Sequence, residues 1–164
     1  MTYSIINPED LGAPKGFNHG MLAEVGGRTL FVAGMTACDA SGEIGEMSFA
    51  GQFEKALANV LTVVREAGGE PSDVGRMTIY VVDISAYKSS RKELGEAYRR
   101  LMGNHYPAMA LVEVSALVDP EALIEIETTA VLSRPCPLRV LFTSTTPTRV
   151  WPRSHSTGPI ASML

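Results

Sequence analysis

The sequence has few cysteines and no long hydrophobic run, and these absences exclude several classes of protein. Its two cysteines, Cys38 and Cys136, are far apart and lack the spacing of a zinc site, so we expect free thiols, no metal and a reducing compartment. No apolar run approaches the ~20 residues of a membrane helix. The start, MTYSIINPEDLG, also lacks the basic and apolar segments of a signal peptide. We therefore predict a cytoplasmic protein that does not bind membranes.

Acidic residues are missing from the end of the chain, and this divides it into two parts. Residues 133–164 contain four arginines, ten serines or threonines and five of the ten prolines, which predicts a largely disordered tail. Residues 1–132 hold 18 acidic and 10 basic side chains, a net charge of −8, and are long enough for one domain. Because phosphate neutralisation dominates nucleic-acid binding, we do not expect so acidic a domain to bind nucleic acid.

Two apolar segments near the end of this domain carry acidic side chains on one side only. In residues 123–131 (LIEIETTAV), Glu125 and Glu127 alternate with isoleucine and threonine. In residues 108–115 (AMALVEVS), Glu113 shares a face with methionine and leucine, while alanine and valine occupy the other face. Alternation of this kind predicts two half-buried strands.

The rest of the domain predicts an α+β fold with two helices on one face of a sheet. The first helix follows the N-cap residue Ser48 and ends at Gly68. The second begins near Asp83 and Ser85 and ends at Gly103; its inner stripe, within residues 87–101, is apolar and aromatic except for Arg91. Further strands are predicted at 2–6, 73–84 and, as a hairpin around Gly26-Gly27, at 21–25 and 28–35.

A glycine- and proline-spaced loop, residues 13–20 (APKGFNHG), places Phe17 and His19 between small residues. Loops of this composition often line sites, because glycine allows close approach of the backbone. Phe17 could equally plug the edge of the core, and His19 could simply occupy a turn. Both interpretations stay open at this point.

The predicted sheet has a second face, which carries the glutamates of its strands. These side chains are too highly charged to pack simply against helices. Several copies of the chain could bury this face together, so we expect a homo-oligomer.

A series of short motifs follows the chain in a distinctive order. They are GFNHG, FVAGM, EAGG followed by SDV, VVD, PAMALVEV and EIETTAV, spread over roughly residues 8–132. Together they resemble the RidA (YjgF) family of enamine/imine deaminases. The resemblance implies a chorismate-mutase-like α+β fold with a mixed sheet, and a homotrimer with clefts at its subunit interfaces. It also implies hydrolysis of 2-aminoacrylate and related imines to 2-keto acids and ammonia without a cofactor.

The resemblance also implies roles for individual residues. Phe17 takes the place of the aromatic residue of the family's glycine-proline-aromatic loop, which is typically tyrosine. Gly34 matches a family glycine, and Met35 stands where the family has glutamine. Glu125 corresponds to the glutamate associated with the attacking water, which makes it the expected catalytic residue. Met109 replaces the arginine that clamps the substrate carboxylate.

Met109 is the main departure from the family. A thioether cannot form the charge-assisted, bidentate pair that an arginine makes with a carboxylate. We therefore predict a poor 2-aminoacrylate deaminase. Because Met109, Leu111 and Phe17 make the expected lining apolar, we also predict a ligand that has no α-carboxylate. His19 or His105 is a candidate replacement cation or general base, although loop histidines are more often structural.

Two functions fit these expectations. The first is a RidA-like deaminase for a non-archetypal small substrate, and the alternative is a non-catalytic trimeric protein that binds a small molecule. For Glu125, water activation and a structural role are equally open, whereas Glu113 and Glu127 are expected to join networks at subunit contacts. Endoribonuclease activity, attached to relatives by name, is disfavoured by the acidic domain and the absence of a histidine pair at helical spacing.

Overall fold

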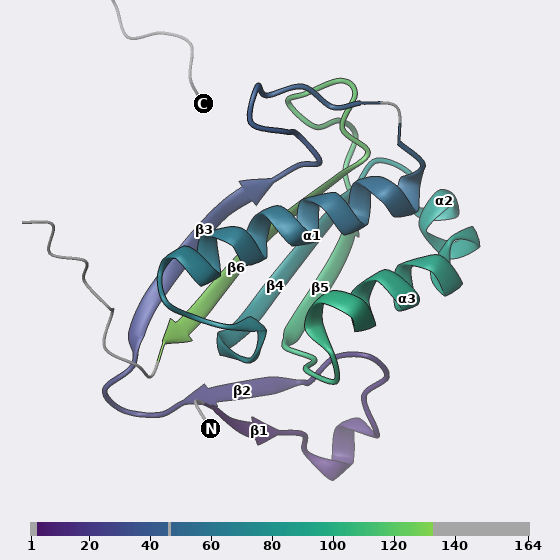
Figure 1. Cartoon of the computed structure of the whole chain (residues 1–164). Coiled ribbons are helices and arrows are strands. Elements are labelled where there is room, and N and C mark those ends of the chain that lie inside the picture. Colours follow the sequence, from purple (N-terminus) through teal and green to yellow (C-terminus); the bar gives the residue numbers. More distant parts are fainter. Residues whose placement is uncertain (1–2, 46, 133–164) are drawn as a thin grey trace, which may run out of the picture.

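The computed structural model describes residues 3–45 and 47–132, and the predicted tail, residues 133–164, lies outside the described residues. The described residues form a four-stranded sheet, a two-stranded sheet and several helices (Figure 1). The strands are β1 (Tyr3–Ile6), β2 (Gly20–Ala23), β3 (Arg28–Met35), β4 (Val74–Val81), β5 (Ala108–Glu113) and β6 (Ile124–Leu132). The helices are α1 (Phe49–Glu66), α2 (Ile84–Ser89) and α3 (Arg91–Met102), with short 3-10 turns η1 (Glu9–Leu11) and η2 (Pro71–Asp73).

Strand β6 lies inside the main sheet, whose order is β3-β6-β4-β5. It runs antiparallel to both of its neighbours, whereas β4 and β5 are parallel, so the sheet is mixed. The predicted alternation in β6 is confirmed. Every second side chain from Ile124 to Leu132 is buried, and those between them, including Glu125 and Glu127, are only partly buried. The isoleucines therefore face the core and the glutamates face the opposite side.

Helices α1 and α3 cover one face of the main sheet, as Figure 1 shows. The core lies between these layers and includes fully buried Leu57 and Leu61 from α1, Met77 from β4 and Ile126 from β6. Burying each such side chain contributes about 2 kcal/mol, so this contact is the main source of stability. The described residues place no helix on the opposite face of the sheet. We call it the open face.

Helix α1 begins as predicted and anchors the segment before β6. Ser48 caps it, because its Oγ accepts a hydrogen bond from the Gly51 backbone N–H at 3.1 Å. One turn later the buried Gln52 side chain donates to the Glu121 carbonyl (3.0 Å) and accepts from the Leu123 N–H (2.8 Å). The start of β6, and with it Glu125, is therefore held by α1.

The hairpin predicted around Gly26-Gly27 is wrong. Strand β2 pairs with β1 in the small sheet, whereas β3 joins the main sheet beside β6. Gly26 has a φ of 97°, and a Cβ at Gly27 would overlap the Val131 side chain. The two glycines therefore let the chain cross closely over the end of β6 instead of turning back on itself.

The prediction of two helices is also wrong, because the described residues contain three α-helices. The predicted second helix is divided into α2 and α3. The Asp83 carboxylate accepts the N–H groups of Ser85 (2.7 Å) and Ala86 (3.0 Å), which starts α2 before the apolar stripe begins. Ser90 then separates the two helices. No helix in the described ranges is both long and apolar enough to cross a membrane.

The small sheet is attached to the main sheet through Tyr3. Its hydroxyl donates to the Asp73 carbonyl at 2.8 Å, and burial raises the pKa of Tyr3 to about 12, so it stays a donor at neutral pH. Gly75 leaves room for the ring, because a Cβ there would come within 2.5 Å of the Tyr3 hydroxyl. The Asn18 N–H also donates to the Pro107 carbonyl at 3.1 Å. These contacts hold the loop that carries Phe17 against the start of β5.

Candidate functional site

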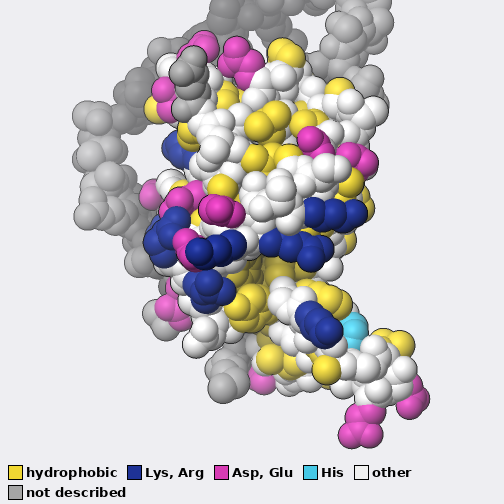
Figure 2. All heavy atoms as spheres, turned by 90° about the vertical axis from the view of Figure 1, so that its right-hand side faces the viewer, with side chains coloured by type: hydrophobic (Ala, Val, Ile, Leu, Met, Phe, Trp, Pro, Cys, Tyr) yellow, Lys and Arg dark blue, Asp and Glu magenta, His cyan; other side chains and the backbone are white. Residues whose placement is uncertain are grey.

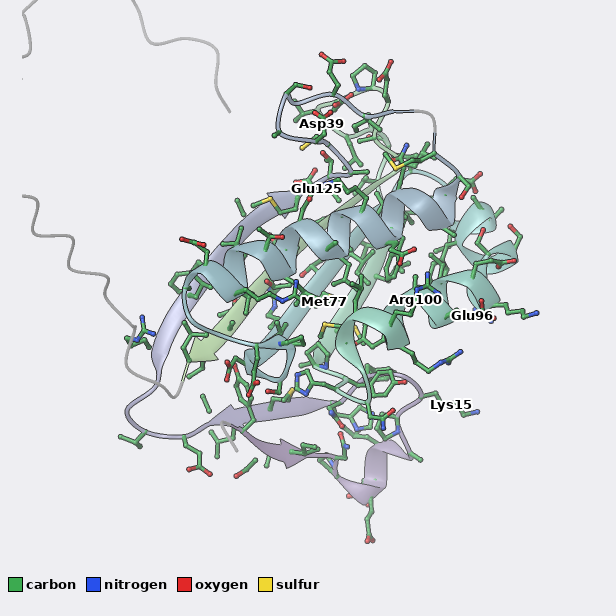
Figure 3. The ribbon with its side chains drawn as sticks, viewed as in Figure 1. Lys15, Asp39, Met77, Glu96, Arg100 and Glu125 are labelled. Carbon is green, nitrogen blue, oxygen red and sulfur yellow. The ribbon has the colours of Figure 1, made fainter. Side chains whose placement is uncertain are left out.

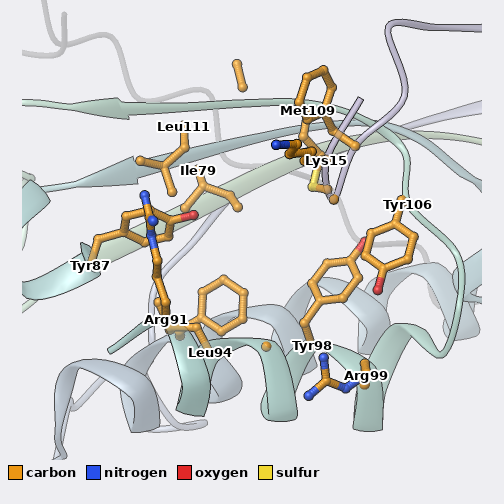
Figure 4. Close-up of a pocket in the computed structure, with 15 residues that line it drawn as sticks. Lys15, Ile79, Tyr87, Arg91, Leu94, Tyr98, Arg99, Tyr106, Met109 and Leu111 are labelled. Atoms are coloured by element: carbon orange, nitrogen blue, oxygen red, sulfur yellow. The ribbon is translucent and has the colours of Figure 1, made fainter. Parts of the chain in front are cut away.

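One pocket contains several of the predicted binding residues and lies between β5, α3 and the loop at 15–17; we call it the main pocket. Its volume is 380 Å³, which is typical of sites for small molecules. Met109 and Leu111 reach into it from β5, across from Leu94 and Tyr98 of α3 (Figure 4). Phe17 lines it as well, so three of the predicted binding residues share one pocket. The remaining apolar and aromatic lining comes from Phe53, Ile79, Tyr87, Leu94, Tyr106 and Ala110.

Two tyrosines form a flat wall of this pocket. The rings of Tyr98 and Tyr106 are stacked, with 5.2 Å between centroids and 13° between planes. The Tyr98 hydroxyl donates to the His105 carbonyl at 2.7 Å, and burial raises its pKa well above the usual value. Tyr98 is therefore a neutral packing group at physiological pH and not an acid or a base.

Three cationic side chains, Lys15, Arg91 and Arg99, also line the pocket, and no aspartate or glutamate is among the described residues that line it. In the described part of the chain none of the three forms an ion pair. The Arg91 guanidinium lies over the Tyr87 ring, 5.9 Å from its centroid, as in a cation–π contact. Figure 2 shows Lys and Arg side chains beside a hollow with a hydrophobic floor. The pocket is therefore electropositive and aromatic.

Glu125 lies outside this pocket, on the open face of the sheet, where it stands opposite Tyr80 of β4. An irregularity in β3 brings Gly34 beside it, and a Cβ at Gly34 would overlap the Glu125 carboxylate. Only glycine permits so close an approach of backbone and carboxylate. Figure 3 shows Glu125 near the end of β3 and Lys15 on the far side of the fold. The predicted site residues thus form two groups, separated by the sheet.

The other two strand glutamates are engaged within the chain. Glu113 accepts the Ile84 N–H at 2.9 Å, and Glu127 accepts the Tyr80 hydroxyl at 3.2 Å. Burial and the hydrogen bond to Glu127 raise the pKa of Tyr80 above its usual value. Glu125, in contrast, accepts no hydrogen bond from any described residue, which leaves its carboxylate available for chemistry. Nor do His, Cys, Asp and Glu side chains of the described ranges gather in threes where a metal could bind.

The remaining predicted site residues lie at the edges of these two groups. Met35 pairs with Ile126 and packs against the core, on the opposite side of β3 from the Gly34 and Glu125 contact. The rings of His19 and Phe17 pack edge to face, with 5.5 Å between their centroids. The buried Nδ1 of His19 has no hydrogen-bond partner among the described residues. His105 Nε2 lies 2.7 Å from a backbone carbonyl oxygen. Neither histidine lines the main pocket, so the cations there are lysine and arginine.

The chain matches known proteins over the whole described domain. The model of the family described as Endoribonuclease L-PSP matches residues 9–132. A crystal structure of a Rid family protein of unknown function from Yersinia pestis is 38% identical, with a TM-score of 0.71, and the match covers 80% of this chain and all of that one. The chain belongs to the RidA (YjgF) family. This confirms the resemblance noted in the motifs, and the mixed α+β fold agrees with it.

Two further relatives and one further solved structure are similar to this RidA-family chain. A RutC family protein of Pyrococcus horikoshii is 33% identical over 119 residues, which cover 72% of this chain and 90% of the relative. The human protein named 2-iminobutanoate/2-iminopropanoate deaminase is 28% identical over 105 residues, 63% of this chain and 73% of the human one. Among solved structures, that of Escherichia coli TdcF with bound serine is 26% identical, with a TM-score of 0.56 over 73% of this chain and 91% of that one.

The cations of the pocket are the residues that sequence reasoning missed. Because Met109 stands at the position of the family's arginine, an apolar lining was expected. The available signal was Arg91, which interrupts an otherwise apolar stripe of the second predicted helix, four residues after Tyr87. Lys15 gives no such signal, because a lysine in a polar loop is usually a solvated residue.

Substituting Gly34 with alanine is expected to displace the Glu125 carboxylate rather than unfold the protein. The overlap involves the end of a flexible side chain, so the cost to the free energy of unfolding should be about 1 kcal/mol. The same substitution in a Glu125→Ala background should cost little, and urea denaturation of the double-mutant cycle measures the difference. Gly45→Ala, whose Cβ would meet no atom within 4 Å, is the control. Equal costs in both backgrounds would disprove the contact.

Proposed function

We propose that this protein hydrolyses a small imine or enamine, with Glu125 as the catalytic residue that orients and deprotonates water. The observation that best supports this role is the available carboxylate of Glu125 beside the Gly34 backbone. Glu113 on β5 and Glu127 on β6 already accept hydrogen bonds within the chain. The similarity to proteins named as imine deaminases supports the class of reaction.

The proposed reaction needs one group that moves protons. Water adds to the carbon of the C=N bond, and the resulting carbinolamine expels ammonia to leave a carbonyl group. A carboxylate can accept a proton from the water and return it to the leaving nitrogen. Gly34, which has no side chain, lets the Glu125 carboxylate lie against the β3 backbone. No cofactor takes part in the proposed steps.

The geometry favours a site that is completed by a second copy of the chain. Within one chain the sheet separates Glu125 from the pocket of Met109, so a cleft that contains both requires a second subunit. The open face also exposes large apolar side chains, with Phe31 78% and Val112 42% exposed. Exposed apolar patches of this kind typically mark protein contacts. We propose a homotrimer in which the open faces pack together and bring Glu125 of one subunit to the pocket of the next.

The pocket itself favours a second candidate function, a trimeric protein that binds a small molecule without turnover. No aspartate, glutamate or histidine is among the described residues of its lining. The Tyr98 hydroxyl, which could otherwise act on a substrate, donates to a backbone carbonyl. Taken alone, the pocket therefore offers binding groups but no general base for neutral pH.

Assembly through the open face can be tested at Phe31. Phe31→Asp places a charge in the proposed contact, and we expect the trimer to dissociate, because burying an unpaired carboxylate is strongly unfavourable. Light scattering after size-exclusion chromatography measures the mass. Val25→Asp, at a fully exposed position in the connection between β2 and β3, is the matched control and should stay trimeric. A monomeric wild-type protein, or a trimeric Phe31→Asp variant, would contradict the proposed assembly.

Catalysis by Glu125 can be tested with Glu125→Gln, which keeps the size of the side chain but cannot accept a proton. Imines generated in solution from amino acids by an amino acid oxidase serve as substrates, and ammonia release is measured. We expect the rate to fall by about a hundredfold or more, the usual contribution of a general base. Glu24→Gln, an exposed position after β2, should leave the rate unchanged. Full activity of Glu125→Gln would refute the role, whereas ligand binding without wild-type turnover would favour the second candidate.

The replacement of the family's arginine by Met109 predicts slow turnover of 2-aminoacrylate. Loss of one partner of a buried charge pair costs roughly 2 to 5 kcal/mol, so kcat/KM should be about thirtyfold to several thousandfold below that of an arginine-bearing relative. Freshly generated 2-aminoacrylate and detection of pyruvate provide the assay, with such a relative as the reference. Equal kcat/KM values for the two proteins would show that Met109 does not limit this substrate.

A further inference from the structure

We propose that the main pocket binds an organic carboxylate with a flat apolar body, and that Arg91 is the residue that anchors the carboxylate. This deepens the proposed function, because it names the class of ligand for the same pocket, but it requires binding only and no turnover. It also revises the expectation, drawn from Met109, Leu111 and Phe17, of a ligand without an α-carboxylate. Three observations support it: the distribution of charge, the position of Arg91 and the shape of the lining.

The charge of the pocket is opposite to that of the domain around it. Residues 1–132 carry a net charge of −8, yet the described lining holds Lys15, Arg91 and Arg99 and no acidic side chain. A neighbouring arginine of α3, Arg100, lies outside the pocket and forms a salt bridge with Glu54 at 2.8 Å. Cations gathered around an apolar hollow in an acidic protein attract an anion and repel a cationic ligand.

Arg91 is held in a position that suits an anchor. Its guanidinium rests on the Tyr87 ring, one helical turn earlier, and in Figure 4 it stands on the opposite side of the pocket from Lys15. Contact with the ring restricts the side chain while its N–H groups remain without a hydrogen bond in the described structure, so a carboxylate can be bound through two parallel bonds. Because the guanidinium of Arg91 is planar and already oriented, little conformational entropy is lost when it pairs with a carboxylate.

The rest of the lining suits a flat apolar body and a single small anionic group. The stacked Tyr98 and Tyr106 form one wall, and Met109 and Leu111 lie across from the helix. The Tyr98 hydroxyl already donates to a carbonyl, so few donors remain beyond the cations. A guanidinium can pair through two parallel bonds with either a carboxylate or a phosphate. We favour the carboxylate, because a largely apolar and aromatic lining suits an anion with a single charge better than one with two. We therefore favour an aryl carboxylate.

Phenylacetate, its neutral analogue phenylacetamide, the ring-free acetate and phenyl phosphate are the probes for this proposal. Isothermal titration calorimetry of the full-length protein should show phenylacetate binding roughly tenfold more tightly than phenylacetamide and than acetate. In Arg91→Gln this preference for phenylacetate over phenylacetamide should disappear. Lys92→Gln removes the same charge from the next position of α3, outside the pocket lining, and should retain the preference. Both positions are exposed, so neither change should alter the melting temperature.

Salt provides a second measurement that does not depend on any variant. Raising the NaCl concentration should weaken phenylacetate binding and leave phenylacetamide binding unchanged. Equal affinity for acid and amide, tightest binding of phenyl phosphate, or the same loss in Lys92→Gln as in Arg91→Gln would each overturn the proposal. The same titrations in Glu125→Gln separate it from the proposed catalysis. Selective binding of phenylacetate there, with no imine hydrolysis by the wild-type protein, would refute the deaminase and support the ligand class.

Discussion

The alternation of side chains along β6 is the constraint on which the rest of the structure depends. β6 is hydrogen-bonded on both sides, so each of its side chains points either toward the helices or toward the open face. Because Ile124 and Ile126 are buried under the helices, Glu125 is committed to the open face. A shift of one residue would bury the glutamates and expose the isoleucines, at a cost of several kcal/mol. Core packing, not site chemistry, therefore sets the position of the candidate catalytic carboxylate.

The same constraint divides the candidate chemistry between the two faces of one sheet. The group able to move a proton, Glu125, stands on the open face, while the groups able to bind a ligand line the pocket on the helix side. The exposed Phe31 on the open face gives a reason for subunits to associate there. In the proposed trimer, binding groups and the proton-transfer group come from different chains, so activity depends on assembly as well as on each residue.

Local patterns predicted much of the fold, and long-range contacts account for what they missed. The alternation of residues 123–131 and the Ser48 cap were predicted correctly, because each depends on neighbouring residues. The hairpin at Gly26-Gly27 failed because the turn signal does not report that Val131, far along the chain, passes close to Gly27. Motif order identified the family and singled out Gly34 and Glu125. The contact between these two residues, and the meeting of Lys15 and Arg91 at one pocket, arise only from the tertiary fold.

Moving the carboxylate anchor from β5 to α3 would change which ligand the pocket selects. The resemblance places the family's carboxylate anchor at the position of Met109, on β5. With the anchor at Arg91, across the pocket, Met109 becomes part of the apolar surface, and a ligand must be long enough to reach both. A short acid could contact Arg91 but would not cover the apolar surface. A neutral aromatic compound would cover the apolar surface but leave Arg91 without an anionic partner. Selectivity then arises from satisfying both groups at once, which is a stronger filter than either alone.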